Sequence, residues 1–275
     1  MTYIISNKYE IIEKIGEGSF GKVFKGKNIR TNESIAIKIQ FKTIVNVLQH
    51  EAKIYRQLVD VSGVPLLKNY GCENGFHYLI VDLLSKSLDQ LDLSHSDVIK
   101  YLIASIDILE NIHNKSIIHR DIKPDNLLIK YNNNYPELYI IDFGLSKLYQ
   151  DVNRKHIDFK KDKKIIGTVK YSSINIHNGN ESSRRDDIES LCYTFISLYG
   201  KTLPWSELCN RLIHEDNKEI EDNIKKIKEN SIDWLRDIPG EFATMLLYAQ
   251  NISFTEKPNY RYLRNLFINL NSLIL

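Results

Sequence analysis

The sequence predicts an α+β fold: a β-rich N-terminal lobe that contains one helix, followed by a mainly helical C-terminal lobe. In the segment 33–41, isoleucines alternate with other residues as in a half-buried strand, and 76–84 is a second strand-like apolar run. After residue 85, apolar residues recur mostly at helical spacing. We therefore expect residues 1–275 to form a single domain, with the N-lobe over about 1–84 and the C-lobe over about 85–275.

The helix expected in the N-lobe covers 44–59. Its inward positions run from Ile44 to Leu58 at spacings of three and four residues, and they include Glu51. Because an isolated carboxylate is costly to bury, Glu51 needs a partner.

In the C-lobe, Ser94 with Asp97 three residues later resembles a helix start, and apolar residues follow at helical spacing up to residue 112. Two short strands are expected at 126–130 and 137–142, with turn residues between them. Further helices are expected around 187–199, 220–228, 241–250 and 260–270.

The composition, 43% hydrophobic and 26% charged, is that of a packed soluble protein. The net charge of +2 does not by itself indicate a nucleic-acid partner, and the lysine-rich segments contain no nucleic-acid-reading motif. Cys72, Cys192 and Cys209 are too scattered for a disulfide framework or a zinc site, which favours an intracellular location, the cytoplasm and/or nucleus. Signal-peptide and membrane-spanning patterns are not seen. We expect a monomer with no membrane partner.

The segment GEGSFGKV places Gly16, Gly18 and Gly21 in the spacing G-x-G-x-x-G. Glycines let the backbone approach phosphate oxygens and leave amide groups free to donate. Dinucleotide-binding turns use the same spacing but lead into a helix, whereas here a strand that carries Lys38 follows. A lone lysine in a strand is usually only solvated. In this context, Lys38 can contact the α- and β-phosphates and pair with Glu51.

The segment HRDIKPDN, 119–126, is the most specific single indication of function in the sequence. The alternative interpretation is a charged loop after a helix with no catalytic role. Asp121 would accept the proton of the substrate hydroxyl or orient that hydroxyl, Lys123 would neutralise the transferring phosphoryl group, and Asn126 would bind Mg²⁺. The segment IDFG then supplies Asp142 as a second metal ligand. Phosphoryl transfer needs positioning and charge neutralisation, and these residues supply both.

Taken together and in order, these segments resemble the active site of a protein kinase. The resemblance implies a bilobal kinase fold with one regulatory helix, and an enzyme that uses ATP and Mg²⁺ to phosphorylate protein substrates. Lys123 and the pair Gly167–Thr168 resemble the Ser/Thr class. Two alternatives are a kinase fold that acts only as a scaffold, and a nucleic-acid-binding module. The complete polar set favours the enzyme.

The segment GTVKYSSINIHNGNESSRRDDIESL, 167–191, resembles the casein kinase 1 family, which has Ser-Ile-Asn where other kinases have Ala-Pro-Glu. The segments 50–58 and 241–267 resemble the same family, and the likeness extends from Tyr9 to Phe267. Vaccinia-related kinases are a weaker match. The resemblance implies phosphorylation of Ser/Thr near acidic or already phosphorylated residues.

The same resemblance implies a substrate anion site, with Arg184 at one position and Lys225 or Lys226 at another. Cationic groups there would bind a phosphoserine through charge-assisted hydrogen bonds. In the alternative interpretation these charges are internal: Asp187 holds the catalytic loop, and Arg184 pairs with Asp186.

Two residues depart from the family pattern. Glu207 stands where the family usually has glycine at the edge of the anion site, and its carboxylate would weaken a preference for phosphate. Cys192 also replaces a glycine, and we expect it to be a packed core thiol.

An apolar adenine site is implied by the same matching. Val81 would be the gatekeeper, and Asp82–Leu84 the hinge that binds the edge of the base. The remaining residues predicted to enclose adenine are Ile15, Val23, Ala36, Leu128 and Ile141. Each also fits a core position, because such a pocket is part of the core.

Overall fold

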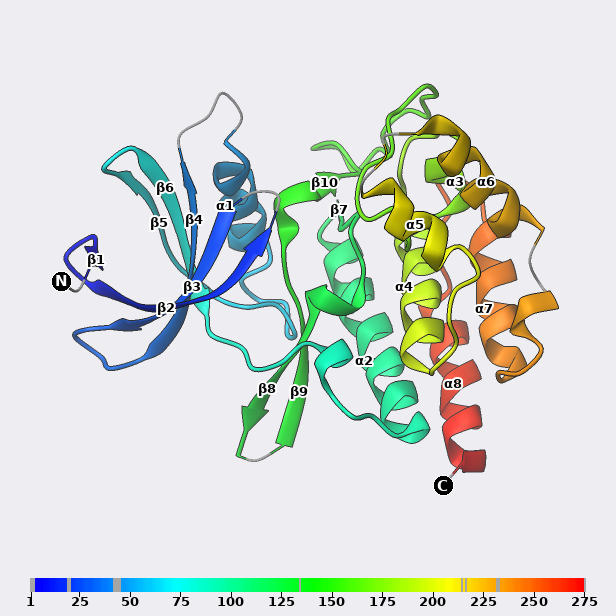
Figure 1. The fold of residues 1–275 in the computed structure, drawn as a ribbon, viewed down its shortest axis with the longest axis horizontal. Coiled ribbons are helices and arrows are strands. Elements are labelled where there is room, and N and C mark those ends of the chain that lie inside the picture. The colour runs from blue at the N-terminus through cyan, green and yellow to red at the C-terminus, as the bar shows by residue number, and fades with distance from the viewer. Residues whose placement is uncertain are drawn as a thin grey trace. The chain divides into compact units, whose positions relative to one another are not determined.

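The structure, a computed structural model, describes residues 3–18, 21–41, 46–133, 135–213, 215, 217–230 and 233–274. Contacts divide the chain into two compact units, Met1–Lys86 with Leu128–Leu145, and Ser87–Leu127 with Ser146–Leu275. The predicted α+β bilobal fold is confirmed, with strands concentrated in the first unit and helices in the second (Figure 1). The segment 128–145 groups with the N-terminal strands, whereas the sequence predicts one division near residue 85.

The first unit contains an antiparallel sheet with the strand order β1-β2-β3-β4-β6-β5. Its strands are β1 (Ile4–Ile5), β2 (Tyr9–Gly18), β3 (Gly21–Asn28), β4 (Ser34–Phe41), β5 (Leu67–Glu73) and β6 (Phe76–Asp82). The alternation predicted for β4 is confirmed, because Ile35 and Ile37 are fully buried. The register pairs Lys38 on β4 with Val23 on β3 and Leu79 on β6, so the lysine sits inside the sheet.

Helix α1 (Val47–Gln57) also belongs to the first unit. The side chain of Asn46 caps it by accepting a hydrogen bond of 2.9 Å from the main-chain N–H of Gln49. Glu51 lies on the buried face, as predicted, while the predicted position Ile44 lies outside the described residues. The two expected short strands form the hairpin β8 (Leu127–Asn132) and β9 (Tyr135–Ile140), which leads to the 3₁₀ turn η3 (Phe143–Leu145).

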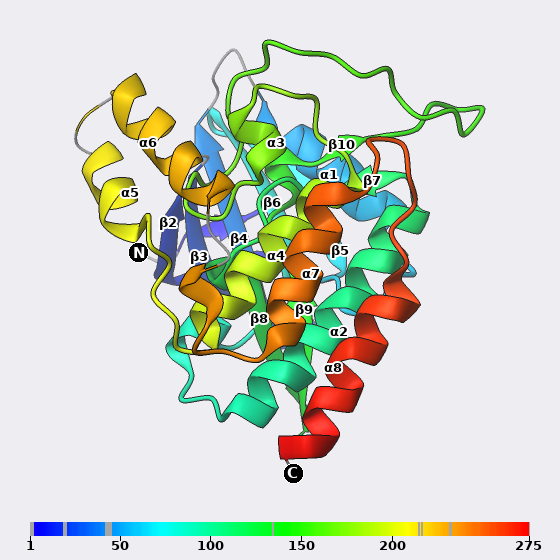
Figure 2. The ribbon, with the colours of Figure 1, turned by 90° about the vertical axis from the view of Figure 1, so that its right-hand side faces the viewer.

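The second unit is mainly helical. Its α-helices are α2 (His95–Asn114), α3 (Ile174–His177), α4 (Arg184–Leu198), α5 (Ser206–Leu212), α6 (Lys218–Glu229), α7 (Gly240–Asn251) and α8 (Tyr260–Ile274). Short pieces complete it: the strands β7 (Ile117–Ile118) and β10 (Lys147–Leu148), and the 3₁₀ turns η1 (Leu88–Gln90), η2 (Pro124–Asn126) and η4 (Asp233–Leu235). Helices α2, α4, α7 and α8 pack side by side around a core of large apolar residues (Figure 2).

The helix start at Ser94 is confirmed, because its Oγ accepts a hydrogen bond from the main-chain N–H of Asp97. The four later helices expected from the sequence correspond to α4, α6, α7 and α8. Helices α3 and α5 were not predicted: α3 has four residues and α5 buries none, so neither shows an apolar period. Among the described residues, no helix combines the length and apolar character needed to cross a bilayer.

Candidate active site

In the first unit, Lys38 joins two carboxylates from different elements. Its Nζ lies 2.9 Å from Oε2 of Glu51 on α1 and 2.8 Å from Oδ1 of Asp142, next to η3. The Glu51 side chain is 2% exposed, so Lys38 is the partner that its burial requires. The sequence prediction of this pair is confirmed.

The pKa values of this cluster follow from burial and from the neighbouring charges. Desolvation alone would lower the pKa of Lys38, but the attraction of Glu51 and Asp142 outweighs it, so this pKa is raised. Desolvation raises the pKa of Glu51, and Lys38 offsets only part of that effect. Lys38 is therefore a permanent cation next to a partly exposed aspartate, an arrangement suited to phosphate oxygens.

Asp142 has an unusual backbone. Its φ of +65° is in the left-handed region, which turns the chain sharply between Ile141 and Phe143. Phe143 is fully buried and packs edge-on against Tyr55 of α1, with ring centroids 5.1 Å apart. The main chain of Asp142 is also hydrogen-bonded to the Tyr55 side chain. Helix α1 thus fixes the turn that presents the Asp142 carboxylate.

The predicted phosphate-binding glycines lie where β2 and β3 meet. Gly18 and Gly21 are register partners, and the residues between them lie outside the described part of the chain. Gly21 has a φ of +144°, and a Cβ there would lie 2.1 Å from the carbonyl oxygen of Ile39, so only glycine fits. A Cβ on Gly18 would meet nothing within 4 Å, and one on Gly16 would make only ordinary contact.

The residues predicted to enclose adenine all belong to the first unit. Ala36 and Val81 are register partners on β4 and β6. Asp82 is buried: its Oδ2 accepts a hydrogen bond of 2.9 Å from the N–H of Leu66, and Lys68 lies 3.0 Å from its Oδ1. This side-chain anchor of the hinge was not predicted. The other members are half-exposed or partly buried: Ile15, Val23, Leu84, Leu128 and Ile141.

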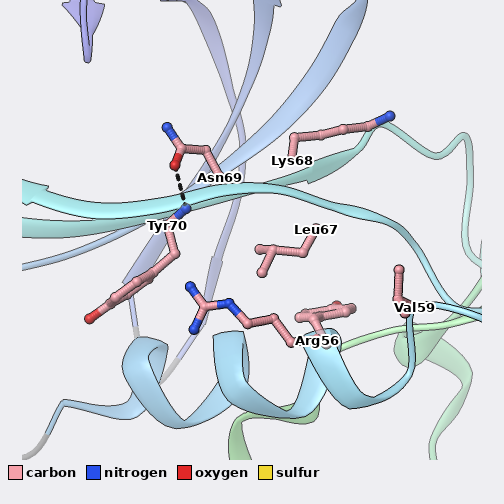
Figure 3. A pocket seen from close by; sticks show the side chains of 7 residues that line it. Arg56, Val59, Leu67, Lys68, Asn69 and Tyr70 are labelled. Atoms are coloured by element: carbon pink, nitrogen blue, oxygen red, sulfur yellow. Dashed lines mark hydrogen bonds between the residues drawn. The ribbon is translucent and has the colours of Figure 1, made fainter.

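A separate pocket of about 320 Å³ opens on the first unit between the end of α1 and the start of β5 (Figure 3). Arg56 reaches from α1 toward Leu67 and Asn69, and Lys68 extends away from them. The pocket is lined by Tyr55, Arg56, Val59, Leu67, Lys68, Asn69 and Tyr70. None of the residues predicted for ATP or catalysis is in this lining.

In the second unit, Asp121, Lys123 and Thr168 form a compact cluster. Oδ1 of Asp121 accepts hydrogen bonds from the main-chain N–H and the hydroxyl of Thr168, at 2.9 and 2.8 Å. Nζ of Lys123 lies 3.1 Å from Oδ2 of Asp121 and donates to Oγ1 of Thr168 at 3.1 Å. The Asp121 carboxylate is therefore held in one orientation with a cation beside it, as a base for a hydroxyl group requires.

The catalytic loop itself is held by Asp187 at the start of α4. This fully buried carboxylate accepts hydrogen bonds from the main-chain N–H groups of His119 and Arg120, at 2.7 and 2.8 Å, and contacts Nε2 of His113 at 2.9 Å. Desolvation would raise its pKa, but the histidines and the N–H group outweigh burial and lower it. The internal role expected for Asp187 in the alternative interpretation is confirmed.

Arg184 does not have the geometry of an anion site. Its residue is 7% exposed, its guanidinium donates to the carbonyl of Thr255 at 2.6 Å and to the hydroxyl of Tyr149 at 3.3 Å, and it stacks over the Tyr149 ring. The expected pairing with Asp186 is also wrong, because Asp186 accepts from Ser173 and from the N–H of Ser183 instead.

The other predicted anion-site residues lie on the surface of the second unit. Lys225 and Lys226 are on α6; Lys225 is partly exposed, 3.8 Å from Glu229, and Lys226 is exposed. Glu207 is exposed on α5. Cys192 is a buried core thiol whose pKa is raised by burial, as predicted.

Asn126 in the second unit and Asp142 in the first each offer an oxygen atom of the kind that Mg²⁺ takes as a ligand. Nδ2 of Asn126 donates to the main-chain carbonyl of Asp121 at 2.9 Å, which leaves the amide oxygen as the ligand atom, and Asp142 keeps a partly exposed carboxylate. Within the described ranges, no group of three or more His, Cys, Asp or Glu side chains is arranged for a metal. Mg²⁺ takes few protein carboxylates and completes its coordination with phosphate and water, so it does not require such a group, and it would supply charge neutralisation at the phosphate oxygens.

Comparison with known families agrees with this geometry. The protein kinase domain matches residues 9–261, which is most of the chain. This protein belongs to the protein kinase domain family. Membership of this family supports a phosphotransferase that takes ATP and acts on proteins.

Two roles in this site were missed by sequence reasoning. In the sequence, Thr168 served only to indicate the Ser/Thr class. In the structure, it donates two hydrogen bonds to Oδ1 of Asp121 and so fixes the orientation of that carboxylate. Lys228 was not considered, although it is buried on α6. A signal for Lys228 exists: it follows Ile220 and Ile224 at steps of four residues, so it lies on their buried stripe.

Proposed function

We propose that this kinase is a Ser/Thr kinase of the casein kinase 1 type. It transfers the γ-phosphoryl group of ATP to serine or threonine near acidic or phosphorylated residues. The observation that supports this most strongly is the cluster of Asp121, Lys123 and Thr168, in which a lysine sits between the base and the threonine that orients it. The Ser-Ile-Asn segment at 173–175 supports the narrower family.

The proposed division of labour follows from the contacts. Asp121 accepts the proton of the substrate hydroxyl or orients it, with its own rotation blocked by Thr168. Lys123 places a positive charge where the transferring phosphoryl group gains negative charge. Lys38 holds the nucleotide phosphates, and Glu51 keeps Lys38 in place.

Fewer observations support the proposed preference for substrates that are acidic or already phosphorylated than support the kinase activity itself. It is supported by the family resemblance and by the surface lysines Lys225 and Lys226, while the buried contacts of Arg184 argue against a part for that residue. Helices α5 and α6 are in contact, so Glu207 places a negative charge on the neighbouring helix. We expect this charge to weaken the preference for phosphate.

The test is phosphate transfer from labelled ATP to four peptides that differ at one feature. One carries phosphoserine three residues before the target serine, one an acidic run, one neither, and one tyrosine in place of the serine. We expect transfer to serine but not tyrosine, and a loss of about 10²–10⁴-fold in Asp121→Asn with the thermal midpoint retained. Transfer to tyrosine would refute the class, and equal activity in Asp121→Asn would refute the base.

A further inference from the structure

Lys228 on α6 has a complete set of internal partners. Its residue is 2% exposed. Nζ donates to the carbonyl oxygens of Val169 and Ser172, at 3.0 and 2.6 Å, and lies 3.1 Å from Nε2 of His177. An ammonium group has three N–H donors, and here three acceptors surround it.

The neighbours of Lys228 favour this arrangement. Desolvation and the nearby cation lower the pKa of His177 to about 3, so its ring is neutral, and Nε2 accepts when the proton is on Nδ1. The ammonium also lies 5.0 Å from the ring centroid of Tyr193 and 4.9 Å from that of Trp205. Such cation–π contacts strengthen when water is excluded.

The accepting carbonyls belong to one short segment, 169–174, which directly follows Thr168. Between the two carbonyls held by Lys228, that of Lys170 accepts a hydrogen bond of 2.7 Å from Nε1 of Trp205. At the far end, the N–H of Ile174 donates to Oε1 of Glu189 at 2.9 Å. The main chain of the segment is therefore held from α4, from α6 and from Trp205, the residue before α5. The side chains of Val169, Lys170 and Ile174 remain partly exposed, whereas those of Tyr171, Ser172 and Ser173 are buried.

This segment lies next to the base in the chain. Thr168 binds Asp121, and the carbonyl of Thr168 accepts hydrogen bonds from the N–H of Tyr171 and the hydroxyl of Ser172. Because 169–174 directly follows Thr168, we expect a polypeptide whose hydroxyl reaches Asp121 to place neighbouring residues near the partly exposed side chains of this segment. The position of the segment then decides how well a substrate docks.

We propose that Lys228 is a positioning residue that holds 169–174 as the docking surface for the protein substrate. The inference rests on the proposed function, which supplies the substrate. A lysine from α6 and a carboxyl group from α4 thus fix this segment through its main chain.

The test compares Lys228→Met with Lys218→Met, an exposed lysine at the start of the same helix. In Lys228→Met we expect the KM for the serine peptide to rise about tenfold or more, because charge-assisted hydrogen bonds are lost. The KM for ATP and kcat stay within about twofold, since Lys38 and Asp121 keep their own contacts. Lys218→Met behaves as the wild type.

A second variant separates positioning from stability. Methionine removes the positive charge that favours the ionised form of buried Glu189, so Lys228→Met unfolds at a lower temperature. Adding Glu189→Gln, which keeps an oxygen acceptor for the N–H of Ile174, recovers part of that loss. The double variant keeps the raised peptide KM, because the carbonyls of Val169 and Ser172 still lack their donor.

Three outcomes would overturn the inference. A peptide KM unchanged in Lys228→Met would refute it directly. A peptide KM that returns to the wild-type value in the double variant would show that Lys228 acts only through stability. No transfer by the wild-type protein would refute the proposed function and this inference with it, which distinguishes the two failures.

Discussion

Lys38 in the first unit and Lys228 in the second are both withdrawn from water, but they face different partners. Lys38 lies between two carboxylates, Glu51 and Asp142. Lys228 lies among main-chain carbonyls and aromatic rings. The first side chain retains 14% exposure, whereas the residue of the second is 2% exposed.

The partners set the pKa values in opposite directions. Both lysines suffer desolvation, which lowers the pKa of an amine. Next to two carboxylates, the pKa of Lys38 is nevertheless raised. Next to neutral acceptors, burial lowers the pKa of Lys228 to about 7, and Glu189 and Cys209 offset only part of that effect.

The difference explains why one lysine can serve a ligand and the other cannot. The partners of Lys38 are anions, so phosphate oxygens can join or replace them without loss of charge compensation. The donors of Lys228 are already matched one by one to internal acceptors. A buried cation is thus assigned to ligand or scaffold by its neighbours and not by its burial.

Of the variants that test this comparison, Lys38→Met has the largest expected effect. We expect kcat to fall by about 10²–10³-fold, because a positive charge that stabilises the phosphates is lost. Lys25→Met, at a partly exposed lysine on the adjacent strand β3, serves as the control. Steady-state kinetics in which only the KM for ATP rises would contradict the assignment of Lys38 to the reacting phosphates.

Asp187 extends the comparison to a carboxylate, since it binds main-chain groups of the catalytic loop as Lys228 binds those of 169–174. Asp187→Asn keeps one oxygen as a hydrogen-bond acceptor but loses the negative charge that holds the main-chain N–H groups of His119 and Arg120. We expect the free energy of unfolding to fall by about 1–3 kcal/mol and kcat to fall with it. Urea unfolding beside Asp222→Asn, at an exposed position on α6, measures this. Equal stability of both variants would show that the loop is held without Asp187.

His177 gives the pH dependence of the Lys228 site. Its pKa is about 3 in the folded protein, because of burial and then Lys228, with Lys225 as a smaller cause, against 6.5 for a free side chain. Below pH 6.5, His177 binds a proton in the unfolded chain but not in the folded chain. The contribution of His177 to the free energy of unfolding is therefore fully present above pH 6.5 and is lost as the pH falls toward 3.

His177→Gln removes this contribution, while the other buried groups that titrate nearby are present in both proteins: Asp186, with a pKa of about 6, and Lys228 and Glu189, with pKa values of about 7. We expect the difference in unfolding free energy between wild type and variant to change by up to about 1.4 kcal/mol per pH unit below 6.5. Urea unfolding at several pH values gives that difference. A difference independent of pH would mean that the pKa of His177 is the same in the folded and the unfolded chain.

Sequence reasoning found the ligand-facing lysine and missed the internal one. Lys38, Glu51, Asp121 and Asp142 are found because phosphoryl transfer imposes residue types at fixed places in the chain. Nothing in a lysine-rich helix marks Lys228 except its spacing from Ile220 and Ile224. The same spacing argument was decisive for Glu51 on α1, and it is the local signal available in both cases.

The prediction for Arg184 failed for a physical reason. Its role was inferred from a matching position, but the direction of its guanidinium is set by Tyr149 and Thr255, which come from distant parts of the chain. Tertiary contacts of this kind leave no local pattern. The fold class, by contrast, was predictable because strand and helix periods are local.

The smallest expected effect is that of Glu207→Gln, which removes a solvent-exposed charge. Glu207 is exposed on α5, and an exposed charge contributes little because water and salt screen it. We expect Glu207→Gln to raise kcat/KM for the phosphoserine-primed peptide about two- to fivefold relative to the neutral peptide, and less at high salt. Glu219→Gln, at an exposed position on α6, is the matched control. An effect as large as that expected for Lys228→Met, or one that persists at 1 M salt, where screening acts within about 3 Å, would show that Glu207 contacts the substrate directly.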